Sequence, residues 1–195
     1  MPNSLEVAAM AFTITGFLGT VPPAPVAARN ESRACPSAVL PAELQRHIQT
    51  DFPSWRPQDV STLSANAKER WQSEKPLDCP GIAIGLFENM NQRTYAVLLV
   101  PANNPDAGYR LLAFTPHGGQ SPDAFRVIEQ SDKIGASNFF VHQIRIAKVF
   151  RTEWVRKLRI NTRDGILFVG SGRSEYETDV YFWAGTRYRH EPIDY

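Results

Sequence analysis

The side chains best suited to chemistry gather in one short stretch, between Arg145 and Arg163. This stretch holds seven basic residues against the single acid Glu153. The basic residues are Arg145, Lys148, Arg151, Arg156, Lys157, Arg159 and Arg163. Cations interleaved with the rings of Phe150 and Trp154 favour an anionic partner, such as a phosphate, an acidic protein face or an anionic envelope polymer.

The same stretch also has a plainer interpretation. Leu158 and Ile160 alternate with Arg159, so the segment Arg156–Asn161 fits an ordinary strand with one solvated face. Both interpretations stay open from the sequence. The tentative binding residues are Arg151, Trp154, Arg156, Lys157 and Arg159.

Motifs for catalysis are weak. His117-Gly118-Gly119 is similar to the glycine-rich turns that supply oxyanion donors in some esterases, but the Gly-x-Ser-x-Gly elbow of those enzymes is missing from the sequence. Glu175 and Glu177 form a carboxylate pair whose alternation is typical of a solvent-facing strand or loop. A hydrolase that uses His117 or His142 with a carboxylate is therefore an alternative, and we expect no enzyme activity.

The histidines do not predict a metal site. None of His47, His117, His142 and His190 is spaced from another as metal ligands are on a helix, and none lies near a cysteine in the sequence. We therefore expect neither a metal nor a cofactor.

The elements that would position these residues can be predicted from periodicity. Leu40, Leu44, Ile48 and Phe52 recur every four residues and predict a helix that Pro53 ends. Ser64 predicts the cap of a second short helix, which runs to about Gln72. The two helices should pack against a sheet formed by the rest of the chain.

After Pro80, short apolar or alternating runs are separated by clusters of glycine, asparagine and proline, which predicts antiparallel strands. The expected strands are Gly81–Glu88, Tyr95–Pro101, Tyr109–Pro116, Phe125–Gln130, Phe139–Ile146, Arg156–Asn161, Ile166–Gly170, Asp179–Trp183 and Tyr188–Ile193. Asp164-Gly165 is expected to form a hairpin turn. The predicted fold class is α+β, with two short N-terminal helices packed on a mostly antiparallel, meandering sheet of roughly seven to nine strands.

The start of the chain predicts export. Val7–Val21 is a run of 15 mostly apolar residues, followed by prolines and by small residues up to Ala28. That order predicts a signal peptide over residues 1–28, although no Lys or Arg precedes the apolar run, and Met10 is an alternative start. A linker over 29–39 and a single domain over 40–195 would follow. We expect a periplasmic or secreted protein without a transmembrane segment in its mature chain.

The chain has two cysteines, Cys35 and Cys79. In an oxidising compartment this pair is a candidate disulfide, and two buried free thiols are the alternative.

Three segments resemble a known group of proteins. Cys79-Pro80-Gly81, the strand Tyr95–Val100 and the ending Val180–Tyr188 resemble small secreted bacterial proteins of unknown function, over roughly residues 38–193. In those proteins a strand leads into an aspartate-rich turn, as in a single FG-GAP-like repeat. The resemblance implies no enzyme activity. Here the corresponding turn, residues 86–94, offers only the carboxylate of Glu88, so we expect a plain hairpin and not a calcium loop.

The aromatic residues near the C-terminus are expected mainly in the core, with an exposed platform for a sugar or a protein as the alternative. They are Tyr181, Phe182, Trp183 and Tyr188. The net charge of +1 at pH 7 disfavours nucleic acid as a partner. The sequence thus predicts a secreted or periplasmic binding protein for a protein or an anionic envelope polymer. An inhibitor or a toxin-neutralising protein would fit this class, and a structural accessory domain is a further alternative.

Overall fold

The computed structural model describes residues 39–74, 79–116, 125–171 and 178–193. Within these ranges the helices are α1 (Ala42–Asp51), α2 (Ala65–Ser73), α3 (Ile146–Val149) and α4 (Thr152–Lys157). The strands are β1 (Trp55–Pro57), β2 (Ile82–Asn89), β3 (Gln92–Pro101), β4 (Tyr109–Phe114), β5 (Phe125–Ser131), β6 (Phe139–Arg145), β7 (Asp164–Gly170), β8 (Thr178–Trp183) and β9 (Tyr188–Pro192). None of the described helices has the length and apolar character needed to cross a membrane.

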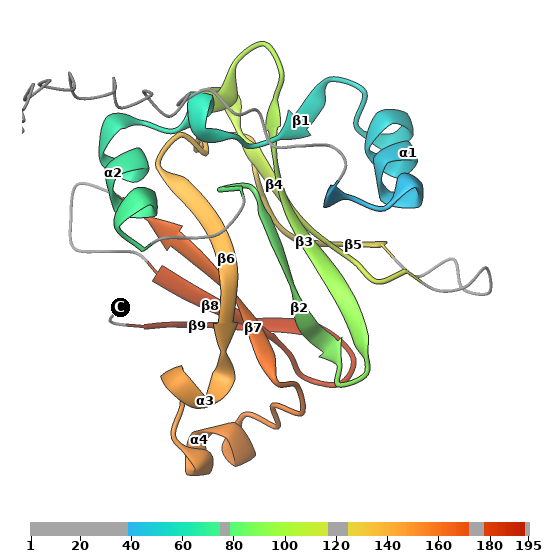
Figure 1. The fold of residues 1–195 in the computed structure, drawn as a ribbon, viewed down its shortest axis with the longest axis vertical. Helices are drawn as coiled ribbons and strands as arrows, with labels where there is room; N and C mark the ends of the chain where they lie inside the picture. The colour runs from blue at the N-terminus through green and yellow to red at the C-terminus, as the bar shows by residue number, and fades with distance from the viewer. Residues whose placement is uncertain (1–38, 75–78, 117–124, 172–177, 194–195) are drawn as a thin grey trace, which may run out of the picture.

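The strands form two antiparallel sheets and not one continuous meander (Figure 1). In the first sheet, β1 and β2 both pair with β3, which is followed by β4 and β5. The second sheet has the order β6-β7-β8-β9. The β-rich, mostly antiparallel α+β class is confirmed, and the prediction of a single sheet is wrong. The two sheets pack face to face because some strands need cover on both sides. In β7 every residue is buried, as expected for a strand that is apolar on both faces.

Three apolar layers result from this arrangement. The central layer lies between the sheets and contains Leu98 of β3 together with Val141 and Ile166 of the second sheet. On the outer face of the first sheet, Leu44 and Ile48 of α1 pack with side chains of β3 and β4. The outer face of the second sheet is covered by α2 and by the segment that contains α3 and α4. The two N-terminal helices therefore pack on different sheets, contrary to the expectation of a shared one.

Two further predictions about elements are wrong. Asp164 and Gly165 do not form a hairpin turn but begin β7, where Asp164 pairs with Arg145 at the end of the β6–β7 ladder. A Cβ on Gly165 would meet Ile146 Cδ1 and Val180 Cγ1, each at 2.9 Å, so the glycine permits close packing inside the sheet. The segment Arg156–Asn161 is not a strand, because its first two residues belong to α4.

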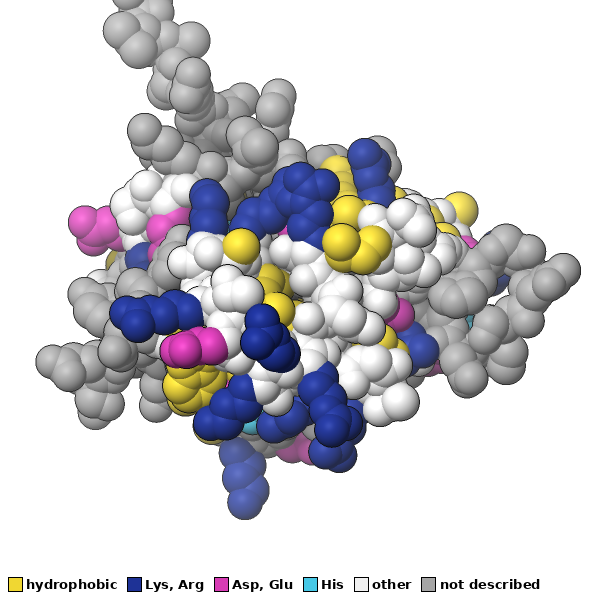
Figure 2. Space-filling view, turned by 90° about the horizontal axis from the view of Figure 1, so that it is seen from below, with side chains coloured by type: hydrophobic (Ala, Val, Ile, Leu, Met, Phe, Trp, Pro, Cys, Tyr) yellow, Lys and Arg dark blue, Asp and Glu magenta, His cyan; other side chains and the backbone are white. Residues whose placement is uncertain are grey.

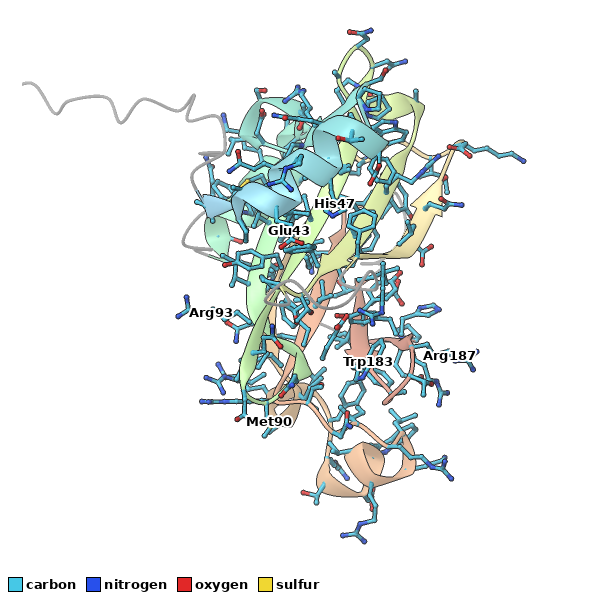
Figure 3. All side chains as sticks on the ribbon, turned by 90° about the vertical axis from the view of Figure 1, so that its right-hand side faces the viewer. Glu43, His47, Met90, Arg93, Trp183 and Arg187 are labelled. Carbon is cyan, nitrogen blue, oxygen red and sulfur yellow. The ribbon has the colours of Figure 1, made fainter. Side chains whose placement is uncertain are left out.

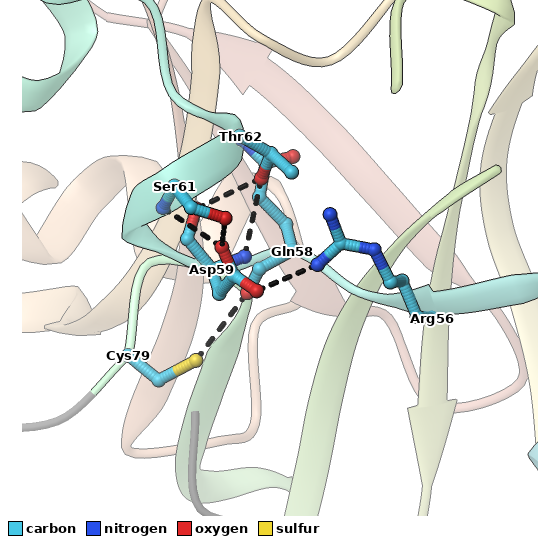
Figure 4. A network of polar contacts seen from close by, with 6 residues as sticks. All are labelled: Arg56, Gln58, Asp59, Ser61, Thr62 and Cys79. Atoms are coloured by element: carbon cyan, nitrogen blue, oxygen red, sulfur yellow. Dashed lines mark hydrogen bonds and ion pairs between the residues drawn. The ribbon is translucent and has the colours of Figure 1, made fainter. Parts of the chain in front are cut away.

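Gln58, which Figure 4 shows beside Asp59 and Cys79, is a buried glutamine that ties the N-terminal part of the chain to the second sheet. The Nε2 atom of Gln58 donates hydrogen bonds to the carbonyl oxygens of Ala136, at 2.8 Å, and Phe139, at 2.6 Å. Its backbone N–H donates to the carbonyl oxygen of Leu98 in β3, at 2.8 Å. The backbone of Gln58 also approaches Gly81 so closely that a Cβ there would lie 2.4 Å from the Gln58 carbonyl oxygen. Gln58 thus links both sheets.

Asp59, the next residue, caps a short 3-10 turn and holds an ion pair. Its side chain accepts hydrogen bonds from the backbone N–H of Ser61, at 2.8 Å, and from the Ser61 hydroxyl. Arg56 Nη1 lies 2.6 Å from Asp59 Oδ2. Burial alone would raise the pKa of Asp59, but the Ser61 hydrogen bonds and the Arg56 guanidinium outweigh burial and hold this pKa below its ordinary value.

Several sequence predictions concern residues outside the described ranges. They are the signal peptide over 1–28, the linker up to residue 38, Cys35, His117, Glu175 and Glu177. Cys79 is described and is 2% exposed, and its Sγ lies 3.4 Å from the carbonyl oxygen of Gln58. Its pairing with Cys35 stays a prediction.

Candidate functional site

The basic stretch is an insertion between two paired strands. The β6–β7 ladder ends at the pair Arg145 and Asp164, and residues 146–163 leave the sheet there and return to it. We call residues 146–163 the basic excursion. In Figure 1 it contains α3 and α4 at the lower end of the molecule, far from α1. The excursion therefore projects from a rigid two-strand base.

Apolar side chains hold the basic excursion against the outer face of the second sheet. Ile146, Leu158 and Ile160 are at most 7% exposed and belong to the same cluster as Leu167 and Phe182 of β7 and β8. Phe150 meets Phe182 edge to face, with ring centroids 5.9 Å apart. These contacts fix the position of the excursion, so its charged residues are presented on an ordered support.

The backbone of the basic excursion explains why the strand prediction failed. The N–H of Leu158 donates to the Trp154 carbonyl oxygen, at 2.8 Å, and Arg159 then adopts φ 56°, in the left-handed region. This turn buries Leu158 and Ile160 and leaves Arg159 exposed. The alternation of buried and exposed residues is therefore real, but a helix end and a turn produce it.

Six cations of the basic excursion are exposed, and one acid, Glu153, lies among them. They are Lys148, Arg151, Arg156, Lys157, Arg159 and Arg163. Within the described part of the chain none of the six forms an ion pair. Figure 2 looks at this end of the molecule and shows Lys and Arg side chains spread over the face, with few acidic ones between them. The structure thus concentrates uncompensated positive charge at one end.

The tentative binding residues all lie on this excursion. Arg151 precedes α4, Trp154, Arg156 and Lys157 belong to it, and Arg159 follows it. Trp154 is 44% exposed, and Lys157 Nζ lies 4.9 Å from the centroid of its ring. Together with Glu153, these two residues line a shallow depression of about 290 Å³. The excursion thus offers an exposed aromatic surface between cations.

A larger hollow lies beside the excursion, on the outer face of the second sheet. It has a volume of about 700 Å³ and is lined by residues of β6, of α3 and of the segment after β9. The lining residues are His142, Gln143, Ile144, Arg145, Lys148, Val149 and Ile193. Sequence analysis did not find this hollow, because Ile193, which helps to line it, lies far along the chain from β6 and α3.

The described histidines lie apart from one another. His47 is on α1 at the opposite end of the molecule (Figure 3), where its ring stacks on Phe125 at 5.8 Å. His190 Nδ1 lies 3.2 Å from Asp179 Oδ1, and His142 Nε2 lies 2.8 Å from Glu74 Oε2. No group of three or more His, Cys, Asp or Glu side chains suited to a metal occurs among the residues that the structure describes.

His142 is the histidine that comes closest to the hydrolase alternative, because it lines the hollow and contacts a carboxylate. Its Nδ1 lies 3.2 Å from the carbonyl oxygen of Gln143, while Nε2 faces Glu74. Both ring nitrogens therefore face oxygen atoms of the protein. This arrangement favours a structural role for His142, and the hydrolase alternative stays an untested prediction.

The C-terminal aromatic residues are confirmed as core. Tyr181, Phe182 and Trp183 are buried, and Tyr188 is half-buried. The hydroxyl of Tyr181 donates to Glu129 Oε2 across the two sheets, at 2.6 Å. Burial first, and the Glu129 carboxylate second, raise the pKa of Tyr181 well above its ordinary value. Tyr181 therefore joins the sheets, Phe182 packs in the layer on the outer face of the second sheet, and these residues do not form an exposed platform.

Sequence analysis did not predict a partly buried ion pair that lies at the end of β2. The side chain of Glu88 is 8% exposed, and Arg126 Nη1 of β5 donates to its two oxygens at 3.1 and 3.0 Å. Arg126 also lies over the Trp183 ring, with its Cζ 5.0 Å from the centroid. Glu88, the one carboxylate of residues 86–94 that a calcium loop could have used, is thus paired with Arg126.

Comparison of the chain with protein-family models, with curated proteins and with solved structures finds no match. The interpretation of the site therefore depends on its own geometry.

Proposed function

We propose that the protein is an exported binding protein that docks on an anionic macromolecule through the basic excursion. The observation that carries this proposal is the set of six exposed cations that make no ion pair within the described part of the chain. An ordinary solvated surface mixes both signs of charge, since clustered like charges repel one another. An anionic partner would relieve that repulsion.

The support of the excursion favours binding over mere solvation. Leu158 and Ile160 anchor it in the core, so its backbone needs little ordering when a partner arrives. Trp154 supplies an exposed apolar contact among them, as is common at the centre of binding surfaces. The cations spread over a surface and do not converge in a closed pocket, which favours a macromolecule with several anionic groups. An acidic protein or an anionic envelope polymer has this chemistry.

The proposal is tested with two model polyanions, poly-L-glutamate and polyphosphate, titrated against the full chain at low and high salt. The variant Arg156→Glu/Arg159→Glu reverses two cations of the excursion. The variant Arg46→Glu/Lys133→Glu changes the net charge equally, but Arg46 lies on α1 and Lys133 in the loop that precedes β6, away from the excursion.

We expect the excursion variant to weaken binding about tenfold or more, since each reversed contact costs on the order of 1 kcal/mol or more, and the control variant to weaken it far less. Binding should also weaken as salt is added. Equal losses in the two variants, or no binding of either polyanion at low salt, would refute the proposal.

The disulfide expected of an exported protein has a separate test. We propose that Cys35 and Cys79 form a disulfide, as expected for a protein of an oxidising compartment. Alkylation of the denatured chain without reductant, followed by mass measurement, should then add no alkyl group. Addition of two alkyl groups to protein isolated from the periplasm or the medium would show free thiols and contradict the pairing.

A further inference from the structure

The hollow beside the excursion combines charge and apolar surface on one wall. Arg145 and Lys148 line it together with the ring of His142, and none of the described lining residues is a carboxylate. Ile144 and Val149, from neighbouring elements, and Ile193, from the end of the described chain, add apolar side chains, and all three belong to or pack against the cluster on the outer face of the second sheet. A volume of about 700 Å³ lies within the range of sites for small ligands.

Arg145 is positioned from behind by a buried carboxylate. Its Nε lies 3.3 Å from Asp164 Oδ1, and the Asp164 side chain is 3% exposed, whereas that of Arg145 is 40% exposed. Asp164 Oδ2 in turn accepts a hydrogen bond from the backbone N–H of Leu86, at 2.9 Å. Asp164 is thus fixed by β2 and holds Arg145 at the end of β6.

Apart from the contact of Arg145 with Asp164, neither Arg145 nor Lys148 pairs with an acid among the described residues. Within the described residues the side chain of Arg145 donates no hydrogen bond, and the side chain of Lys148 forms neither a hydrogen bond nor an ion pair. A planar guanidinium can bind two oxygens of a carboxylate or phosphate at once, and an ammonium group nearby adds a point charge. These two cations therefore define the place of an anionic head.

We infer that this hollow binds a small organic anion, a carboxylate or a phosphate monoester carried on a compact apolar body. The head contacts Arg145 and Lys148, and the body lies against Ile144, Val149 and Ile193. The hollow shares Lys148 with the docking surface proposed above, but it uses neither Arg156 nor Arg159, which do not line it. The inference therefore does not depend on the proposed function.

The test uses the full chain and four probes in a titration followed by NMR. Benzoate and phenyl phosphate share an apolar ring and differ in their anionic head, so their relative affinities distinguish a carboxylate from a phosphate ligand. Benzamide keeps the ring without the charge, and inorganic phosphate keeps the charge without the ring. We expect saturable binding of benzoate or phenyl phosphate, with shifts at the amides of residues 144–149, and weaker binding of both controls.

Lys148→Glu should weaken binding of the better probe by about tenfold or more, because it replaces a ligand contact with repulsion. Lys148 is exposed, so the variant should keep the circular dichroism spectrum of the parent, and Lys148→Ala gives the same test by a smaller change. Arg151→Glu is the matched control. It removes a cation of the same excursion that does not line the hollow, and we expect less than about a threefold change at physiological salt.

Three results would overturn the inference: no saturable binding of either aromatic anion, equal affinity for inorganic phosphate and phenyl phosphate, or equal losses in the Lys148 and Arg151 variants. The variant Arg156→Glu/Arg159→Glu should keep its affinity for the small probe while losing the polyanions. This contrast separates failure of the hollow from failure of the docking surface.

Discussion

Replacement of Gln58 by methionine tests how strongly one side chain joins the two sheets. Methionine has a similar length and volume, so Gln58→Met removes the two Nε2 donors without leaving a large cavity. The donors serve the carbonyl oxygens of Ala136 and Phe139 at 2.8 and 2.6 Å, just before and at the start of β6. The backbone hydrogen bond from Gln58 to Leu98 does not depend on the side chain.

The expected loss follows from these contacts. Two buried hydrogen bonds contribute about 1 kcal/mol each to the net stability, which sets a lower value of about 2 kcal/mol. The Ala136 carbonyl keeps a second donor, the backbone N–H of Phe139 at 2.9 Å, so at most one carbonyl oxygen loses its partner. Desolvation of that one group raises the expected loss to about 4 kcal/mol. This is a large part of the total of about 5–15 kcal/mol that is usual for a domain.

The measurement is urea denaturation at pH 7, followed by circular dichroism, with Gln49→Met as the control. Gln49 is exposed on α1, so its replacement should change the free energy of unfolding by less than about 0.5 kcal/mol. The two variants should also have the same slope of free energy against urea as the parent. A loss in Gln58→Met no larger than in Gln49→Met would refute the view that Gln58 joins the sheets.

Two further changes address neighbours of Gln58. Gly81→Ala should lower the free energy of unfolding by at least about 2 kcal/mol. The new Cβ would lie 2.4 Å from the Gln58 carbonyl oxygen, so backbone atoms must move. An unchanged thermal midpoint would contradict this close approach. The pKa of Asp59 is lower in the folded than in the unfolded chain, so its stabilising contribution is present above the unfolded pKa of about 3.9 and is lost as the pH falls through the folded pKa. Asp59→Asn should therefore destabilise the protein at pH 7 and show a smaller loss of stability than the parent between about pH 5 and pH 2, measured by urea denaturation at each pH; parallel profiles would show that Asp59 is not responsible.

The strands could be predicted from the sequence, and their assembly into two sheets could not. The predicted ranges overlap β2 to β9, because alternating or apolar runs between turn residues are a local signal. The runs Val97–Val100 and Ile166–Val169 are apolar at every position, which is typical of strands covered on both faces. These apolar runs indicate strands that are covered on both faces, but they do not show which strand begins the second sheet. β1 was missed because it has only three residues and includes Pro57.

The candidate site was predicted by its charge and not by its shape. The excess of cations between Arg145 and Arg163 is a property of composition, so it could be seen without a structure. The backbone could not be assigned, because burial of Leu158 and Ile160 imitates a strand although a turn at Arg159 causes it. The hollow depends on Ile193 meeting α3 and β6, and no local pattern predicts such a long-range contact.

The ends of the insertion at residues 146–163 emerge next to each other, since Arg145 and Asp164 are cross-strand partners. A loop that leaves and re-enters a sheet at paired residues can be replaced by one of different length without a change in strand pairing, provided that the new loop again covers Leu167 and Phe182. The two packed sheets therefore form a constant support, and the basic excursion is the part that can be replaced. Because residues 146–163 are contiguous in the sequence, a change in this one segment would alter the binding surface while the two sheets keep their residues.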